Sequence, residues 1–184
     1  MRIIAGSAKG LRLKAPKGLA TRPTSDRVRE ALFSILSPAL PGARFLDLFA
    51  GSGAVGLEAL SRGADRAVFV EKSRQAQAVI SDNLKRTSLQ ERAEIIPVPA
   101  EKAIKLLAGR REQFEIVFLD PPYGQNFVPK TIELLLEADL LSRGGCVVAE
   151  TMKGEDLPPK IKMLLHTRKA EYGQTALHFY FPEE

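Results

Sequence analysis

The stretch LDLFAGSGAVGLEAL, residues 46–60, joins an apolar run to a helix-like pattern through three glycines. Gly51, Gly53 and Gly56 have the spacing G-x-G-x-x-G and lie between a predicted strand and a predicted helix, as that motif requires. Glu71 ends the next predicted strand, 20 residues after Gly51, where an acidic residue would hold the hydroxyl groups of a ribose. The stretch therefore predicts a Rossmann-like fold with a site for an adenosine-containing ligand.

Two carboxylates indicate which ligand this is. Asp47 lies near the carboxyl end of the first predicted strand, and Asp120 ends a later one. Open α/β sheets bind ligands at this edge. Two negative charges disfavour the pyrophosphate of a dinucleotide such as NAD and suit a cation. S-adenosylmethionine carries a sulfonium and an ammonium group beside its ribose, so the charges favour it as the cofactor.

Strand and helix patterns alternate on both sides of the glycine stretch. Near-continuously apolar strands that alternate with helices predict an α/β fold with a parallel sheet covered on both faces. Residues 162–173 and 175–181 break this alternation and predict a closing antiparallel hairpin, whereas residues 2–15 predict a short N-terminal hairpin. Strands are predicted at 43–49, 66–71, 93–98, 114–120 and 145–151, and helices at 22–36, 54–63, 74–87, 101–109 and 129–138.

The segment FLDPPYGQ, residues 118–125, places an acid, two prolines and an aromatic ring directly after a strand. The exocyclic amine of a nucleobase is a poor nucleophile until its N–H groups are held by acceptors. The carboxylate of Asp120 and the carbonyl of Pro121 would be these acceptors, and Pro121 and Pro122 would fix their positions. Tyr123 would stack on a base swung out of its helix. The segment thus predicts methyl transfer to an amine, driven mainly by orientation.

Positive charge is concentrated at one end of the chain. The net charge is +5, but residues 1–29 contain eight Lys and Arg residues and one acid, Asp26, so the rest of the chain is slightly acidic. This basic segment favours a polyanionic partner. One cysteine and two histidines make no metal site of familiar spacing, and no apolar run is long enough to cross a membrane. We expect a cytoplasmic protein without a metal.

Four segments of the chain together resemble the RsmD family, the bacterial 16S rRNA guanine-N2 methyltransferases. They are DLFAGSGAVGLEALSRGA, FLDPPY, MRIIAG and RPTSDRVREALFSIL. The resemblance runs over essentially the whole chain. It implies a class I S-adenosylmethionine-dependent methyltransferase fold with a seven-stranded, mostly parallel sheet and a small basic N-terminal β-hairpin extension. The substrate would be a guanine of the 966 type in 16S rRNA, either free or within a small-subunit ribosomal particle, and the enzyme would be a monomer.

The chain departs from the family at one position. The family often reads DAEKAL where this chain reads PAEKAI, so Pro99 stands where an Asp lies beside the adenine. A backbone group of Ala100 would take over that contact. The candidate cofactor-binding residues are Asp47, Phe49, Gly51, Gly53, Glu71, Ala100, Arg22 and Thr24; the candidate catalytic residues are Asp120, Pro121, Pro122 and Tyr123; and the candidate RNA-binding residues are Arg2, Lys9, Arg12 and Lys14.

Two other functions remain open at this point. Asp-Pro-Pro-Tyr also occurs in DNA adenine-N6 methyltransferases, although these usually carry an additional domain that reads the duplex. A catalytically silent RNA-binding module would have no need of the glycine loop, Glu71 and Asp120. We expect two segments, a basic arm at 1–22 and one methyltransferase domain at 23–184.

Overall fold

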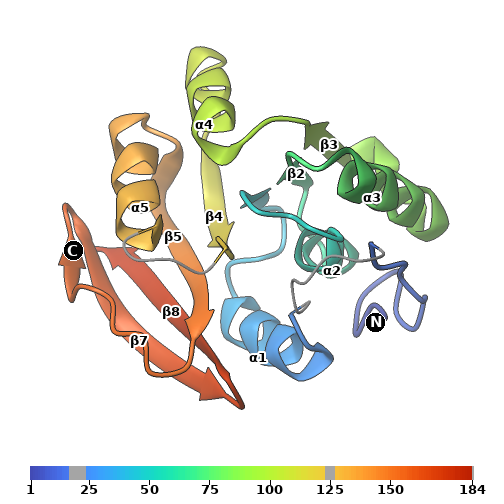
Figure 1. Ribbon diagram of the computed structural model, residues 1–184, viewed down its shortest axis with the longest axis horizontal. Coiled ribbons are helices and arrows are strands. Elements are labelled where there is room, and N and C mark those ends of the chain that lie inside the picture. The colour runs from blue at the N-terminus through green and yellow to red at the C-terminus, as the bar shows by residue number, and fades with distance from the viewer. Residues whose placement is uncertain (17–23, 123–126, 184) are drawn as a thin grey trace.

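Eight strands form one sheet in the order β3-β2-β1-β4-β5-β8-β7-β6. The computed structural model describes residues 1–16, 24–122 and 127–183 (Figure 1). The strands are β1 (Arg44–Asp47), β2 (Arg66–Val70), β3 (Ala93–Ile96), β4 (Phe114–Leu119), β5 (Leu141–Met152), β6 (Lys160–Ile161), β7 (Leu164–Tyr172) and β8 (Thr175–Pro182). The helices are α1 (Asp26–Leu36), α2 (Ala54–Ser61), α3 (Arg74–Thr87), α4 (Ala100–Gly109) and α5 (Phe127–Glu137), with a 3-10 turn, η1 (Gln90–Arg92).

The sheet confirms the predicted fold class but corrects the strand count. Strands β3, β2, β1, β4 and β5 pair in parallel, and β8 pairs antiparallel with β5 and β7. Seven strands were predicted. The eighth is β6, a two-residue edge strand that pairs with Leu164 and Leu165 of β7. It follows Pro158 and Pro159, and a strand this short leaves no periodic pattern in the sequence.

Both faces of the sheet are covered by helices, as the apolar strands predicted. One buried cluster joins residues of α1, α2 and α3 to alternate strand residues such as Phe45 and Phe118. A second cluster joins α4 and α5 to the intervening residues, such as Leu46 and Val117. Strand side chains alternate between the two faces, so each strand contributes to both clusters.

The helix starts follow from local capping. Ser25 accepts a hydrogen bond from the N–H of Val28 at the start of α1. Ser73 accepts one from the N–H of Ala76 at the start of α3. Each serine satisfies an N–H group that has no partner inside its helix. Both helices therefore begin where Ser, Thr or Asp precede an apolar repeat.

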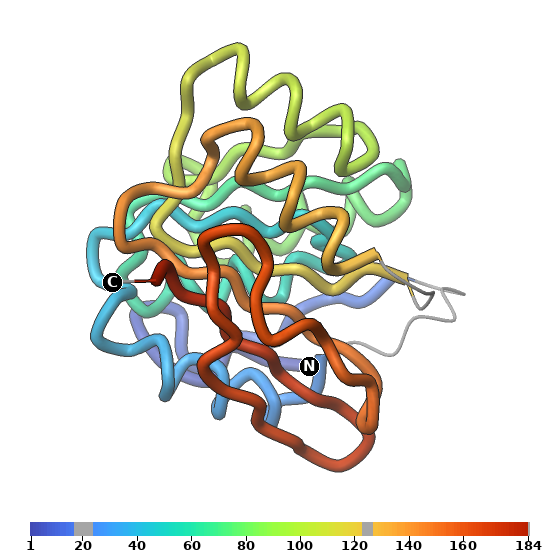
Figure 2. Tube along the Cα trace, turned by 90° about the vertical axis from the view of Figure 1, so that its left-hand side faces the viewer, coloured from blue at the N-terminus to red at the C-terminus, as the bar shows by residue number. Residues whose placement is uncertain are grey.

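The predicted tail hairpin is present, and Tyr172 and Thr175 close it (Figure 2). His178 of β8, one strand of this hairpin, is fully buried. Its Nε2 lies 3.1 Å from Oγ1 of Thr151, and its Nδ1 lies 3.1 Å from Nε2 of His166. Burial lowers the pKa of His178 to about 4. The neutral ring is thus part of the packing between β5, β7 and β8.

The N-terminal segment pairs with itself as predicted and also packs on the core. Arg2 and Arg12 form an antiparallel bridge, and the N–H of Ile3 bonds the carbonyl of Leu11. Ile3 is fully buried within the cluster that contains α2. From here on, the arm means residues 1–14, a shorter segment than the basic arm predicted at 1–22. Its apolar side chains make it part of the packed core.

The carboxylate of Glu58 on α2 anchors the arm. It is fully buried and accepts hydrogen bonds from the N–H groups of Ile4 (2.8 Å) and Ala5 (3.0 Å). Arg62 forms a 2.7 Å ion pair with the same side chain. A buried carboxylate with three donors is well compensated, so Glu58 holds the arm against α2.

Candidate active site

The glycine loop joins β1 to α2 as predicted. Gly53 is the residue before α2 and has a φ of 77°, and Gly51 has a φ of 54°. These left-handed conformations favour glycine. The loop turns sharply at Ala50, whose carbonyl accepts the N–H of Gly53 at 2.7 Å. It therefore places a short helix N-terminus directly after the strand.

The three glycines have different roles. A Cβ on Gly56 would lie 2.4 Å from the ring of Phe69, so this glycine lets α2 pack against β2. A Cβ on Gly53 would meet Ile80 of α3 at 3.2 Å. A Cβ on Gly51 would have no atom within 4 Å. Gly51 is thus the position of the triplet that faces open space, where a ligand has room.

Glu71 is brought to the glycine loop from the end of β2. Its Oε2 accepts the N–H of Gly51 at 2.9 Å, and its Oε1 accepts the N–H of Ser73 at 2.8 Å. One carboxylate thus ties the loop to the start of α3. The structure therefore places the carboxylate of Glu71 beside the glycine loop, and its role in holding ribose hydroxyl groups stays a prediction.

Asp47 ends β1 in the interior of the protein. It is 1% exposed, and its Oδ1 has no hydrogen-bond partner in the described part of the chain. Burial raises its pKa to about 7, although the N–H groups of Phe49 and Gly56 bond the carboxylate. A buried oxygen without a partner is costly, and a cationic ligand group would supply the missing one.

Asp120 directly follows β4, the neighbour of β1. Burial first, and then the charges of Glu150 and Asp47, raise the pKa of its carboxyl group to about 8. Pro121 is buried and Pro122 is exposed. Tyr123, the remaining candidate catalytic residue, lies outside the described residues. The strand order therefore brings two predicted acids, from β1 and β4, to one edge of the sheet.

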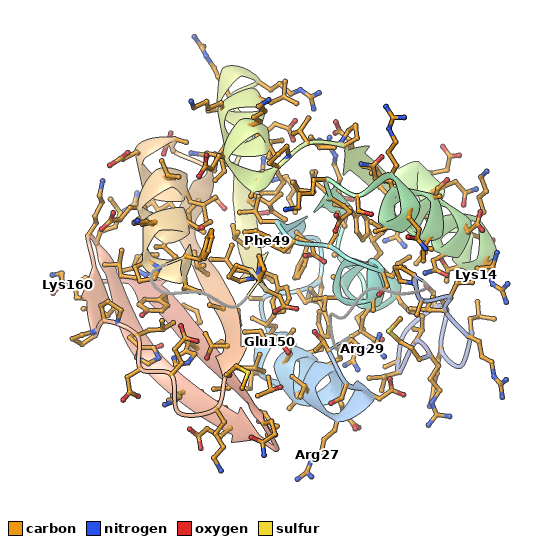
Figure 3. The ribbon with its side chains drawn as sticks, viewed as in Figure 1. Lys14, Arg27, Arg29, Phe49, Glu150 and Lys160 are labelled. Atoms are coloured by element: carbon orange, nitrogen blue, oxygen red, sulfur yellow. The ribbon has the colours of Figure 1, made fainter. Side chains whose placement is uncertain are left out.

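Glu150 of β5 is a third acid at this edge, and the sequence analysis missed it. The hydroxyl of Thr24 donates a 2.7 Å hydrogen bond to its Oε2. Burial raises the pKa of Glu150. Figure 3 shows Glu150 and Phe49 close to the centre of the molecule. A signal was present, because in CVVAE an acid follows an apolar run, as in IVFLD.

The other cofactor candidates lie around these acids. Phe49 follows Asp47 in the loop and packs partly buried against the α4 and α5 cluster. Ala100 begins α4, and Pro99 precedes it without a side-chain cap. Thr24 is buried and bonds Glu150. Arg22 lies outside the described residues.

The four candidate RNA-binding side chains are exposed, but they are not equivalent. Lys14 forms a 2.7 Å ion pair with Asp82 of α3, and Arg2 lies 3.8 Å from Asp26. Lys9 and Arg12 form no ion pair with a described residue. Arg29 belongs to the same basic segment, yet it is fully buried and donates to the carbonyl of Arg2. It stabilises the arm and contributes no charge to the surface.

Asn83 connects the arm to the glycine loop. It exchanges two backbone hydrogen bonds with Lys14, and its Nδ2 also donates to the carbonyl of Ser52 at 3.1 Å. One buried side chain therefore bonds both the arm and the glycine loop.

Comparisons with known proteins agree with this geometry. A family described as conserved hypothetical protein 95 matches residues 1–181. Ribosomal RNA small subunit methyltransferase D of Escherichia coli is 37% identical over 181 residues, which cover 98% of this chain and 89% of that protein. The chain belongs to the RsmD family.

Two further proteins are similar to this chain over nearly its whole length. YlbH of Bacillus subtilis is 41% identical over 180 residues, which cover 98% of each chain. The solved structure of yhhF from Escherichia coli aligns with a TM-score of 0.85 at 35% identity and covers 100% of this chain and 98% of that one. The fold is that of the class I methyltransferases.

No group of three or more His, Cys, Asp and Glu residues in the described part of the chain could hold a metal ion. In the same residues, no helix is both long enough and apolar enough to span a bilayer.

Proposed function

We propose that this chain transfers a methyl group from S-adenosylmethionine to the exocyclic N2 of a guanine in 16S rRNA, of the 966 type. The observation that carries the proposal is the position of Asp120 in its Asp-Pro-Pro segment, at the same sheet edge as Asp47 and the glycine loop. The name of the Escherichia coli relative, a small-subunit rRNA methyltransferase, supports the choice of RNA.

The residues of the site fit the cofactor. Asp47 has an unpartnered buried oxygen that a ligand ammonium group would satisfy. Gly51 leaves open space, and Glu71 lies where ribose hydroxyl groups could replace or share its bond to the N–H of Gly51. When bound, the cofactor supplies an electrophilic methyl group. Its positive charge also suits an edge with several carboxylates.

The chain itself contributes orientation. The carboxylate of Asp120 and the carbonyl of Pro121 accept hydrogen bonds from the guanine amine, which aims the nitrogen lone pair at the methyl carbon. Both prolines restrict φ, so the acceptors are held before substrate arrives. As the N–C bond forms, an amine proton leaves, and the carboxylate of Asp120 is positioned to receive it. Tyr123 would stack on the guanine.

Identification of the labelled nucleoside tests this function. The protein is incubated with radiolabelled cofactor and, in separate reactions, with free 16S rRNA, small-subunit particles or duplex DNA. Digestion should give N2-methylguanosine from the RNA or the particles. N6-methyladenosine from DNA would indicate an adenine-N6 enzyme, and RNA binding without any label would indicate a silent module.

A further inference from the structure

Asp120 and Glu150 are neighbours at the carboxyl ends of two parallel strands. Leu119 of β4 pairs with Ala149 of β5, so the next residue on each strand is a carboxylic acid. Side chains one step further along paired strands share a face. The electrostatic interaction between the two groups is strong enough to raise the pKa of Asp120. The mechanism above uses Asp120 and leaves Glu150 without a role.

Glu150 is held in place but has a free acceptor. Thr24 bonds Oε2, and no residue in the described ranges donates to Oε1. Asp120 likewise accepts no hydrogen bond from any residue described. Asp47, which is 1% exposed with an unpartnered Oδ1, lies within electrostatic range of Asp120. The site therefore offers several acceptors and requires a ligand with several donors.

Guanine has such donors on one edge. Its N1–H and the two N–H bonds of its 2-amino group lie side by side. Adenine presents a 6-amino group beside N1, which is an acceptor. An ionised carboxylate opposite N1 is therefore bonded by guanine and repelled by the lone pair of adenine.

We infer that Glu150 is the specificity residue of the site: its carboxylate accepts the N1–H of guanine while Asp120 accepts the adjacent N2–H. The inference rests on the proposed function. Thr24 acts through Glu150 as a positioning residue, because its hydroxyl fixes one carboxylate oxygen and directs the other. The positive charge of the cofactor and the donors of guanine together favour the ionised form of both acids.

The base 2-aminopurine separates the two roles. It keeps the 2-amino group that is methylated, but its N1 is an acceptor. Wild-type enzyme and the variant Glu150→Gln are assayed with RNA carrying guanine or 2-aminopurine at the labelled position. Wild type should prefer guanine in kcat/KM by roughly 10²-fold or more, because a site built for a donor rejects a substrate without it. In Glu150→Gln the preference should narrow at least roughly tenfold, since the amide N–H can donate to N1.

Three controls make the outcome decisive. Glu133→Gln makes the same chemical change on an exposed part of α5 and should keep the wild-type preference. Thr24→Val should narrow the preference, whereas Thr24→Ser, which keeps the hydroxyl, should restore it. Thermal melting and calorimetric titration with S-adenosylmethionine show whether each variant is folded and binds cofactor.

Failure of the inference differs from failure of the proposed function. If wild type labels guanine N2 but Glu150→Gln has the same guanine preference, Glu150 does not read N1. If wild type labels no guanine N2 in any RNA, both proposals are overturned.

Discussion

At the scale of single residues, the charge state of Asp120 determines whether it can accept the amine hydrogen. Asp120→Ala should lower turnover by roughly 10²–10³-fold, because one oriented contact is lost, while cofactor affinity changes only a few-fold. Asp120→Asn should retain more activity, since an amide oxygen still accepts. Single-turnover rates with saturating RNA measure the difference. Equal, near-wild-type rates for both variants would remove the orienting role.

The pH dependence of catalysis is a second test of Asp120. Its pKa is raised to about 8, so the free enzyme below that pH holds a proton on the acceptor. We expect kcat/KM to rise with pH up to about 8 in wild type. Asp120→Asn cannot titrate and should have a flatter profile. A profile that is unchanged by this substitution would assign the rise to another group.

Asp47 gives a pH dependence of stability in the absence of cofactor. Its folded pKa, about 7, lies above the ordinary value of 3.8, so its contribution to stability is full below pH 3.8 and is lost as pH rises through 7. Most of this loss lies below pH 7, so between pH 6.5 and 8.5 the free energy of unfolding should fall by only about 0.8 kcal/mol from this group. Asp47→Asn should reduce the fall.

The titration of His178 sets the lower limit of the pH range for this measurement. Its folded pKa is lowered to about 4, so its contribution is present above the ordinary value of 6.5 and is lost as pH falls toward 4. Above pH 6.5 that contribution is constant. Asp120, whose pKa is raised to about 8, also titrates in this range, so the Asp47 effect is the difference between wild type and Asp47→Asn. Urea denaturation of both proteins at several pH values, with and without S-adenosylmethionine, measures it. An unfolding free energy that rises over this range would contradict it.

Single residues also show what the sequence could predict. Asp47, Glu71 and Asp120 were found because each ends an apolar strand at a position with a known chemical use. Glu150 also follows an apolar run, but it lies two residues before the end of β5, and its relation to Asp120 depends on β5 lying beside β4. Strand order is a property of the whole sheet. For the same reason, the missing partner of Asp47 Oδ1 became visible only with the buried surroundings in place.

At the scale of elements, two glycines of the loop allow helix packing and ligand binding to be tested separately. Gly56→Ala should destabilise the fold by roughly 1–3 kcal/mol, because its Cβ would overlap the ring of Phe69. Gly51→Ala should cost roughly 1–2 kcal/mol of backbone strain. Its main effect should be weaker binding of S-adenosylmethionine, because the methyl group enters open space beside the loop. Melting curves and calorimetric titrations of both variants test this, and wild-type affinity in Gly51→Ala would place the cofactor elsewhere.

The arm offers a matched pair of glycines. Gly6 and Gly10 have φ values of 86° and 85°, so alanine is equally strained at both. A Cβ on Gly6 would lie 1.8 Å from the carbonyl oxygen of Ser61, whereas one on Gly10 would meet no atom within 4 Å. Gly6→Ala should therefore cost more stability than Gly10→Ala and increase hydrogen exchange at Ile4 and Ala5. Equal losses of unfolding free energy in the two variants would mean that the arm does not need close contact with α2.

Elements with a repeat or a cap were predictable. The Ser25 and Ser73 caps, the alternating helices and the tail hairpin each leave a local signature. β6 leaves none, because two residues cannot show a period. The hydrogen bonds of the arm to Glu58 and Asn83 were also missed, since the partners are 54 and 69 residues apart.

At the scale of the whole molecule, two exposed side chains of the arm, Lys9 and Arg12, form no ion pair with a described residue. Figure 3 shows Lys14 and Lys160 at opposite ends of the molecule. If the arm binds RNA phosphates, Lys9→Ala with Arg12→Ala should flatten the slope of log affinity against log salt by roughly 1.4–1.8, at ~0.7–0.9 for each contact. Lys14→Ala should flatten the slope by a smaller amount, because the Lys14 side chain is paired with Asp82.

The control for the charge prediction is Lys160→Ala, which removes a charge far from the arm. Binding of RNA or small-subunit particles is measured over a salt series, beside cofactor titration. A slope unchanged by the double variant would place the RNA surface elsewhere, with Lys85 and Arg86 of α3 as the next exposed candidates.

The anchoring of the arm has a consequence for biosynthesis. Ile4 and Ala5 are translated 54 and 53 residues before Glu58, the side chain that bonds them. At ~5–20 residues per second, the nascent arm waits roughly 3–11 seconds for that partner, and longer while α2 leaves the ribosome. Ile3, buried in the finished protein, lacks its packing partners on α2 during this interval. The arm therefore joins the fold only after α2 has been translated.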